Sequence, residues 1–275
     1  MNPKPPRYAV VMLLPHCNMR CDFCITDGFM GTLTEEETAP LIRLFKREGF
    51  ASVVLGGGEP LLWKPGLDAG ASSDRRERPA VFELAKRLKA EGFETQLGTN
   101  GIALPAGFET KTEIDRYVLP LDGPDAETHE RVRRYGSGHF ALVRDRIETC
   151  FRSGKSLTLS TVVTRFNASK IKALYELIAG WHAARPFLHA WHLYQFVPSG
   201  RGGFRNADRL SVDPAVFEDA VRAVREAKPA FQVFKRPDLF HSKDVEFFWK
   251  EDDNLLRRLH TRVIRFQVRG RSGIP

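Results

Sequence analysis

The feature that most constrains the fold is a regular alternation between residues 8 and 197, in which apolar runs of strand length are separated by helical segments. The first run, 8–14, is continuously apolar, which is typical of a strand buried on both faces of a parallel sheet. A capping box at 34–37 starts the first helical segment, and helical spacing recurs between the later runs. Strands are expected at residues 8–14, 51–55, 93–97, 114–121, 157–163 and 190–197. Six strands alternating with helices favour a parallel α/β fold with right-handed crossovers.

The length of the chain limits the number of strands that the barrel can have. An eight-stranded barrel needs more chain before Pro198 than is present. A six-stranded open barrel fits, so the predicted fold class is α/β, a partial (β/α)6 open barrel of six parallel strands with a short C-terminal α+β extension. We expect the core at residues 1–202 and the extension at 203–275. The extension is expected to close the mouth of the barrel and to end in a basic tail.

Polar motifs follow the predicted strands at their carboxyl ends. In parallel α/β folds, ligands bind at that edge of the sheet. The motifs are the cysteine-rich stretch 17–24, Gly-Gly-Gly-Glu-Pro at 56–60, Gly-Thr-Asn-Gly at 98–101, Asp-Gly-Pro at 122–124 and Pro-Ser-Gly-Arg-Gly at 198–202. This shared position predicts one binding region assembled from several strand ends.

Three of the four cysteines, Cys17, Cys21 and Cys24, lie within eight residues after the first strand. Iron–sulfur clusters are bound by cysteine thiolates at short spacings, and a cubane normally takes four. Three thiolates leave one iron with an open position, where chemistry can occur. A Cys3His zinc site that includes His16 is the alternative, although adjacent residues rarely converge on one tetrahedral ion. Four cysteines in 275 residues do not form a disulfide framework.

The Cys-x3-Cys-x2-Cys spacing, with Phe23 before the third cysteine, resembles the radical S-adenosylmethionine (SAM) superfamily. The Gly-Gly-Glu-Pro and Thr-Asn-Gly motifs strengthen the resemblance, which covers residues 8–202. It implies a [4Fe-4S] cluster whose open iron is chelated by SAM, and an external electron donor such as flavodoxin or ferredoxin. The implied reaction is reductive cleavage of SAM to a 5′-deoxyadenosyl radical that abstracts hydrogen from a substrate.

The resemblance also assigns residues to SAM. Glu59 would accept hydrogen bonds from the SAM amine, and Gly57 and Gly58 allow the close approach of a ligand. Thr99 and Asn100 would bind polar groups of SAM. Phe23 would pack near the adenine.

The fourth strand ends in a variant of the family pattern. Asp122 belongs to a segment that commonly reads Ser-x-Asp-Gly, but Pro120 replaces the serine and removes a hydroxyl donor. Farther along, Arg133 or Arg134 would pair with the SAM carboxylate, a task that suits a planar guanidinium, and the sequence does not choose between them.

The fifth and sixth strands show viperin-like and cofactor-maturation-like features. Arg165 and Asn167, at the end of the fifth strand, face either SAM or substrate. His192 and Tyr194 lie on one face of the sixth strand and are candidate substrate contacts, with satisfied core residues as the alternative. No cysteine follows Cys150, which is expected to be a core thiol, so no ligands remain for an auxiliary cluster.

Composition restricts the class of protein. No apolar run approaches the ~20 residues that span a bilayer, so no membrane association is expected. Free thiols for a cluster require a reducing compartment, which predicts a cytoplasmic protein. The net charge of +8 is concentrated in a tail with six arginines after Asp253, which we interpret as a solvated tail, and nucleic acid is not expected as a partner.

We therefore expect a radical SAM enzyme that acts on a small substrate, nucleotide-like or phosphorylated. The alternatives are a zinc-containing nucleic-acid-binding protein and a radical SAM enzyme that modifies peptides or natural products without auxiliary clusters.

Overall fold

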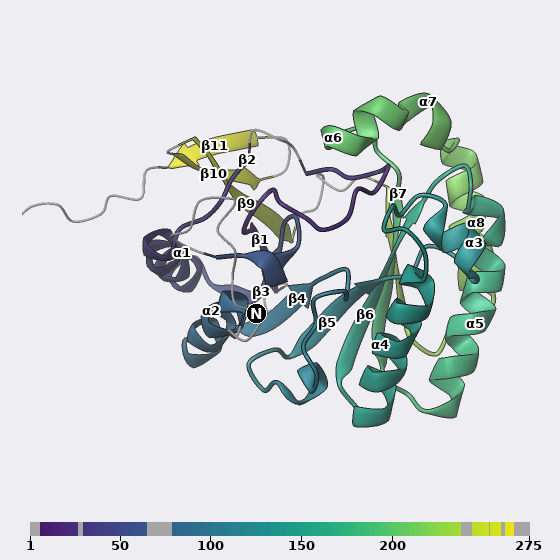
Figure 1. The fold of residues 1–275 in the computed structure, drawn as a ribbon, viewed down its shortest axis with the longest axis horizontal. Helices are drawn as coiled ribbons and strands as arrows, with labels where there is room; N and C mark the ends of the chain where they lie inside the picture. The colour runs from purple at the N-terminus through teal and green to yellow at the C-terminus, as the bar shows by residue number, and fades with distance from the viewer. Residues whose placement is uncertain are drawn as a thin grey trace, which may run out of the picture. The chain divides into compact units, whose positions relative to one another are not determined.

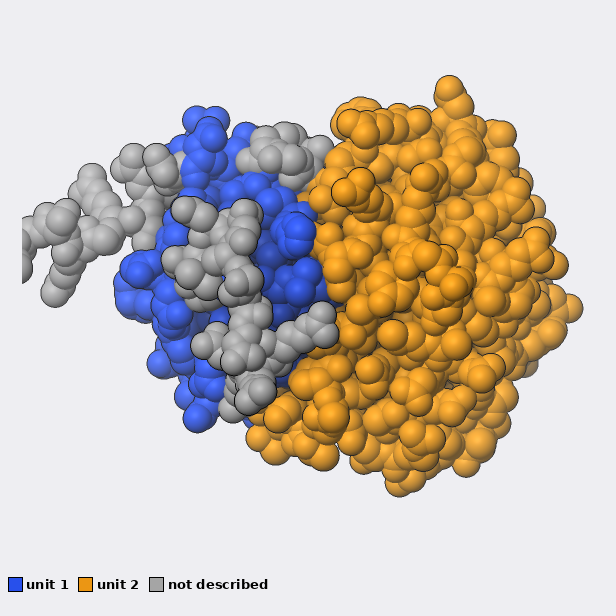
Figure 2. Space-filling model, in the orientation of Figure 1, with its two compact units in different colours: residues 1–16, 28–97, 240–275 blue, residues 17–27, 98–239 orange. Residues whose placement is uncertain are grey.

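The computed structural model describes residues 6–26, 30–64, 79–237, 244–252, 254–259 and 262–266. The chain forms two compact units that interleave along the sequence (Figure 2). Unit 1 comprises residues 1–16, 28–97 and 240–275, and unit 2 comprises residues 17–27 and 98–239. The sequence also predicts a surface loop at residues 64–79, which are rich in Gly, Ser, Asp and Arg, and this segment lies almost entirely outside the described residues.

Unit 1 is a sheet with two helices. Its strands are β1 (Arg7–Met12), β2 (Met30–Gly31), β3 (Phe50–Gly56), β4 (Glu94–Gly98), β9 (Val245–Glu251), β10 (Asn254–Leu259) and β11 (Arg262–Phe266). They follow the order β11-β10-β9-β1-β3-β4, with β2 paired to β9. β1, β3, β4 and β9 are parallel, whereas β10 and β11 are antiparallel additions. Helices α1 (Glu35–Arg47) and α2 (Ala80–Ala90) and the 3-10 turn Pro60–Leu62 connect them.

Local sequence explains the start of α1 and the core beneath it. The predicted capping box is present, because the Glu37 carboxylate accepts a hydrogen bond from Thr34 N at 2.7 Å. The apolar face of α1 directs Phe45 into edge contacts with Phe50 and Phe248, at centroid distances of 5.3 and 4.9 Å. Phe248 belongs to β9, so the C-terminal segment contributes to the same core as α1 and β3.

Unit 2 contains the other parallel strands, β5 (Arg116–Pro120), β6 (Ser156–Val163), β7 (Leu188–Gln195) and β8 (Gln232–Arg236). Its helices are α3 (Ala126–Glu130), α4 (His139–Ser153), α5 (Ile171–Ala184), α6 (Gly200–Gly203), α7 (Ala207–Leu210) and α8 (Pro214–Glu226). Short 3-10 turns lie at Phe108–Thr110, Ala168–Lys170 and Phe204–Asn206. Helices α4, α5 and α8 cover one face of β5–β8 (Figure 1).

The predicted α/β fold with an open, mostly parallel sheet is confirmed, including all six predicted core strands. The segment after residue 202 has the predicted helix and short strands, and its β8 and β9 are parallel neighbours of core strands β7 and β1. The assignment of 203–275 as a separate closing extension stays a prediction. Among the tail arginines, Arg257 is not simply solvated, because it pairs with Glu48 and Glu246. Within the described residues, none of the helices is long and apolar enough to span a bilayer.

Candidate active site

The cysteine loop, residues 17–24 of unit 2, presents three free thiols that are all half-buried. Asn100 Nδ2 lies 3.6 Å from Cys17 Sγ, and Arg133 Nη1 lies 3.8 Å from Cys21 Sγ, so two sulfurs receive N–H donors. Burial raises the pKa of the Cys21 thiol to about 11, although the nearby Arg133 charge acts to lower it. Metal binding must therefore displace a proton from Cys21.

These features fit a cluster bound by three thiolates. Iron–sulfur clusters are anionic, and hydrogen bonds to their sulfurs help to set the reduction potential. In the described part of the chain, no three His, Cys, Asp or Glu side chains are grouped closely enough to bind a single metal ion. The fit to a cluster rests on three accessible thiols within one loop and on the donors that face their sulfurs.

Backbone contacts fix the conformation of the loop from two sides. Asp22 N donates to Val132 O at 2.9 Å, and Gly202 N donates to Cys24 O at 3.0 Å. A Cβ atom on Gly202 would lie 2.6 Å from Cys21 O and 2.7 Å from Cys24 N, so only glycine allows α6 to approach this closely. The sequence predicted that residues 198–202 and the cysteine loop belong to one binding region, but it did not indicate this direct backbone contact.

Asp22, between the second and third cysteines, forms two ion pairs that the sequence did not indicate. Its side chain is buried, and its Oδ1 lies 2.6 Å from Arg134 Nε. Arg209 forms a second ion pair with the same carboxylate, and Asn206 Nδ2 donates to the Asp22 carbonyl at 3.0 Å. Arg134, one of the two candidates for the SAM carboxylate, is therefore placed on Asp22. Its role toward SAM stays untested.

Arg133 is buried beside the cysteine loop. It forms an ion pair with Asp122, and its guanidinium lies 4.9 Å from the centre of the Phe23 ring. Burial acts to lower the pKa of Arg133, but Asp122 and Cys21 raise it above its ordinary value, so Arg133 stays charged. Asp122 is itself fully buried, and its Oδ1 accepts from Val162 N at 2.8 Å. The structure thus brings together four predicted residues: Phe23, Asp122, Arg133 and Cys21.

The Thr-Asn-Gly turn after β4 contacts the start of the cysteine loop. Asn100 Nδ2 donates to Asn18 Oδ1 at 2.7 Å as well as facing the Cys17 sulfur. Asn100 Oδ1 accepts from Ile102 N at 3.0 Å, and Thr99 Oγ1 accepts from Gly101 N at 3.0 Å. The amide of Asn100 therefore connects the predicted binding turn to the predicted metal loop.

Two buried histidines link the turns after β4 and β5, and His139 was not predicted. Asp122 N donates to His129 Nδ1 at 3.0 Å, which makes His129 Nε2 the donor to His139 Nδ1 at 2.8 Å. His139 Nε2 then donates to Asn100 O at 3.0 Å. Burial, with the charge of Arg133, lowers the pKa of His129 to about 2, so both rings are neutral in this chain of hydrogen bonds.

The Gly-Gly-Glu-Pro motif lies in unit 1. Gly58 N donates to Leu14 O at 2.7 Å, and a Cβ atom on Gly58 would lie 1.8 Å from His16 O. Glu59 is fully buried, and its Oε1 accepts from Leu61 N at 3.2 Å. Gly57 has a φ of 117°, which favours glycine. The assignment of these three residues to SAM stays a prediction from the motif.

The remaining predicted residues lie after β6 and on β7. Arg165 is exposed, and its Nε donates to Ser211 O at 3.3 Å. Asn167 is buried, and its Nδ2 donates to Asp122 O and Val162 O, both at 2.9 Å, so its amide is used within the protein. His192 and Tyr194 share one face of β7, as predicted.

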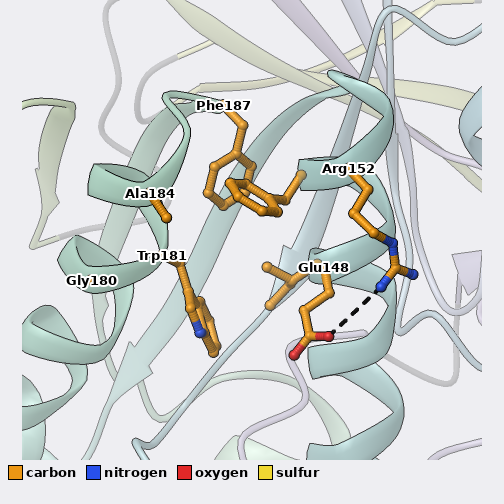
Figure 3. Close-up of a pocket in the computed structure, with 8 residues that line it drawn as sticks. Glu148, Arg152, Gly180, Trp181, Ala184 and Phe187 are labelled. Atoms are coloured by element: carbon orange, nitrogen blue, oxygen red, sulfur yellow. Dashed lines mark ion pairs between the residues drawn. The ribbon is translucent and has the colours of Figure 1, made fainter.

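A separate hollow lies between α4 and α5 (Figure 3). Phe151, Trp181 and Phe187 line it, and Arg152 and Glu148 form an ion pair at 4.0 Å on its α4 side. Phe187 directly precedes β7, so this hollow lies toward the amino ends of the strands and away from the motifs.

Comparison with known proteins gives a consistent picture. The sequence matches the Radical SAM superfamily over residues 11–178, more than half of the chain. An AdoMet-dependent heme synthase of Oleidesulfovibrio alaskensis is 26% identical over 204 residues, covering 72% of this chain and 47% of that protein. An S-adenosylmethionine-dependent nucleotide dehydratase of Flammeovirga pacifica is 26% identical, covering 79% of this chain and 71% of that protein. A probable GTP 3′,8-cyclase of Methanopyrus kandleri is 29% identical, with coverage of 87% and 68%.

Among solved structures, Streptococcus suis SuiB bound to S-adenosylmethionine has a TM-score of 0.63 at 14% identity. The likeness covers 85% of this chain and 51% of SuiB, and it shows the fold alone. The chain spans about half the length of the curated relatives it first matches, with shares of 47% and 56% for two heme synthases.

Proposed function

This chain belongs to the radical SAM superfamily, and from that premise we propose that it abstracts hydrogen from a small nucleotide-like or phosphorylated substrate. Members use a [4Fe-4S] cluster and SAM. The bound, reduced cluster supplies the electron that cleaves SAM to methionine and a 5′-deoxyadenosyl radical, the species that removes a hydrogen atom from substrate. The family match favours this function over a zinc-containing nucleic-acid-binding protein.

The observation on which the proposal depends is the set of three free thiols at Cys17, Cys21 and Cys24, with N–H donors from Asn100 and Arg133 at two of them. These cysteines would bind three irons and leave the fourth open. The donors would stabilise negative charge on the sulfurs, which favours the reduced state of a cluster.

For the SAM carboxylate we propose Arg133 in preference to Arg134. Arg133 is buried next to the loop, and its Nη1 points toward Cys21, whereas Arg134 is more exposed and pairs with Asp22. The Asp122 ion pair holds the Arg133 guanidinium in position. A fixed, permanently charged guanidinium suits bidentate binding of a carboxylate.

The remaining contacts to SAM are proposed from the family motifs. We assign the SAM amine to Glu59 beside Gly57 and Gly58, polar groups of SAM to Thr99 and Asn100, and the adenine to the neighbourhood of Phe23. The burial of Phe23 in an apolar cluster with Val132, Phe196 and Leu210 supports an apolar wall there.

We further propose that an acidic protein such as flavodoxin or ferredoxin supplies the electron. Arg134 and Arg209 pair with Asp22 in the cysteine loop, and Arg131 and Arg209 lie over the Phe166 ring at 4.1 and 5.6 Å. This positive charge next to the loop would steer a negatively charged donor toward the cluster. Free thiols and a low-potential cluster place the reaction in a reducing compartment, which we take to be the cytoplasm.

The substrate class draws support from relatives named for a nucleotide dehydratase and a GTP cyclase.

Anaerobic reconstitution with iron and sulfide tests the function. Wild-type protein should bind about four irons per chain, and with dithionite it should convert SAM to 5′-deoxyadenosine. Cys24→Ala should lose iron and activity, whereas Cys150→Ala, which removes a buried thiol outside the loop, should keep both. An iron-loaded wild type that leaves SAM intact would contradict the proposal. Zinc in place of iron would favour the alternative, a zinc-containing nucleic-acid-binding protein.

A further inference from the structure

One face of strands β6, β7 and β8 in unit 2 has a chemistry that the SAM-binding motifs do not use. Helices α4, α5 and α8 cover one face of this sheet (Figure 1). On β8, Lys235 Nζ pairs with Glu218 of α8 at 2.7 Å, so Lys235 faces these helices. Leu193 pairs with Lys235 in the register, and Trp191 precedes Leu193 by two residues, so the fully buried Trp191 and Leu193 face the same way. The alternate positions on these strands must therefore face the other side of the sheet. We define the polar face by its residues Ser160, His192, Tyr194, Phe234 and Arg236.

The strand register places these residues in two short rows. Ser160, His192 and Phe234 are paired across the three strands, and Tyr194 pairs with Arg236 in the next row. Neighbouring strands lie about 4.8 Å apart, and same-face residues along a strand lie about 7 Å apart. The five side chains thus lie within the dimensions of one small, flat ligand.

The polar face begins beside the cysteine loop. Val162 pairs with Tyr194 in the register and packs against the apolar cluster that contains Phe23 and Phe196. Cys21 packs against the same cluster. Because Phe196 follows Tyr194 by two residues, the carboxyl end of the polar face is adjacent to the cysteine loop, which would bind the cluster.

The charged side chain on this face is Arg236. The Arg236 guanidinium lies 5.1 Å from the centre of the Phe234 ring, and no carboxylate among the described residues pairs with it. His192 Nδ1 lies 3.1 Å from Tyr194 Oη, and its ring lies 5.0 Å from Phe234. Burial, followed by the Arg236 charge, lowers the pKa of His192 to about 3, and burial raises the pKa of Tyr194, so both are neutral at pH 7.

A partly buried guanidinium with no carboxylate partner in the described part of the chain favours binding of an anion, and an adjacent aromatic ring suits a flat ligand. We propose that the polar face binds the substrate, and that this substrate is a flat conjugated ring bearing anionic groups. Its phosphate or carboxylate pairs with Arg236, its ring packs on Phe234, and Tyr194 and His192 contact its polar edge. The inference rests on the proposed function and adds to it the substrate site and its chemistry.

Binding to the cluster-loaded enzyme saturated with SAM tests the inference, since SAM then occupies its own site. Isothermal titration calorimetry would measure CTP and GTP against cytidine and guanosine, and hemin against hemin dimethyl ester. The variants are Arg236→Gln and Arg236→Lys, with Lys235→Gln as the matched control on the helix-covered face. Thermal unfolding would verify that each variant is folded, and Arg236→Lys keeps the charge if Arg236→Gln fails to fold.

At least one anionic probe should bind wild type and Lys235→Gln at least about tenfold more tightly than its uncharged counterpart. Arg236→Gln should remove that advantage, and Arg236→Lys should retain part of it. Preference for the triphosphates identifies phosphate as the anion, and preference for hemin identifies carboxylate. Equal binding of charged and uncharged probes, or of wild type and Arg236→Gln, would overturn the inference. Cleavage of SAM in the absence of substrate is measured separately. A protein that fails to cleave SAM can therefore be distinguished from one that fails to bind the anionic probe.

Discussion

Replacement of Gly202 by alanine should disrupt the proposed cluster site without changing a cysteine. The new Cβ would lie 2.6 Å from Cys21 O and 2.7 Å from Cys24 N, both backbone atoms that cannot rotate away. Real Cβ contacts are not this short, so α6 or the loop must move. Overpacking of this kind costs about 1–3 kcal/mol. Here the displaced segment contains two of the three proposed iron ligands.

Gly180 provides the matched control. It lies within α5, and a Cβ atom built there would meet no atom within 4 Å. Gly180→Ala should stabilise the helix by up to about 1 kcal/mol, because alanine has the higher helix propensity. The two variants make the same chemical change, and they differ only in the space available.

Two measurements check this reasoning. Urea unfolding of the metal-free proteins should show Gly202→Ala less stable than wild type and Gly180→Ala equal or more stable. Anaerobic reconstitution should give Gly202→Ala clearly less iron per chain, while Gly180→Ala reaches the wild-type content. If Gly202→Ala bound iron as well as wild type and unfolded at the same urea concentration, the contact between α6 and the loop would not have the role we assign to it.

Two further predictions concern Arg133 and His129. Arg133→Lys should weaken SAM binding at least about tenfold, because lysine cannot form two parallel hydrogen bonds to a carboxylate. Arg134→Lys should leave the affinity for SAM nearly unchanged. Titration of the cluster-loaded proteins with SAM would measure both affinities, and a larger loss in Arg134→Lys would contradict our choice of Arg133. The second prediction concerns His129, whose pKa is lowered from 6.5 to about 2 in the folded chain. Because the unfolded chain then binds more protons below pH 6.5, the free energy of unfolding falls as the pH decreases. Between pH 6.5 and 5.5, this group should lower the free energy of unfolding of the metal-free wild type by about 1 kcal/mol. His129→Gln should show a correspondingly smaller loss in urea unfolding. An equal pH dependence of wild type and His129→Gln would refute the assignment.

Features encoded over a few residues could be predicted from the sequence. The strand runs, the capping box at Thr34 and the three cysteines all depend on short spacings, and the structure contains each of them. The position of Asn100 next to Cys17 also followed, because parallel strands place their carboxyl ends at one edge.

Contacts between distant segments could not be predicted in this way. Asp22 and Arg209 pair across 187 residues, and nothing in the spacing of either residue indicates the other. His139 lies at the start of α4, where a histidine is ordinary, and only the folded chain shows it between His129 and Asn100. The parallel pairing of β9 with β1 was missed for the same reason, since its short run could equally have been an isolated edge strand.

The location of the polar face shows how sequence pattern and long-range contacts combine. Alternation along β7 places His192 and Tyr194 on one side and Trp191 on the other, but alternation alone does not say which side packs against helices. The ion pair between Lys235 and Glu218 on α8 decides it, because β8 is in register with β7. The helices therefore cover the Trp191 side, and the side with the polar residues stays available to a ligand. The apolar pattern that packs the sheet against these helices thus leaves the polar residues on the opposite face, where we propose that the substrate binds.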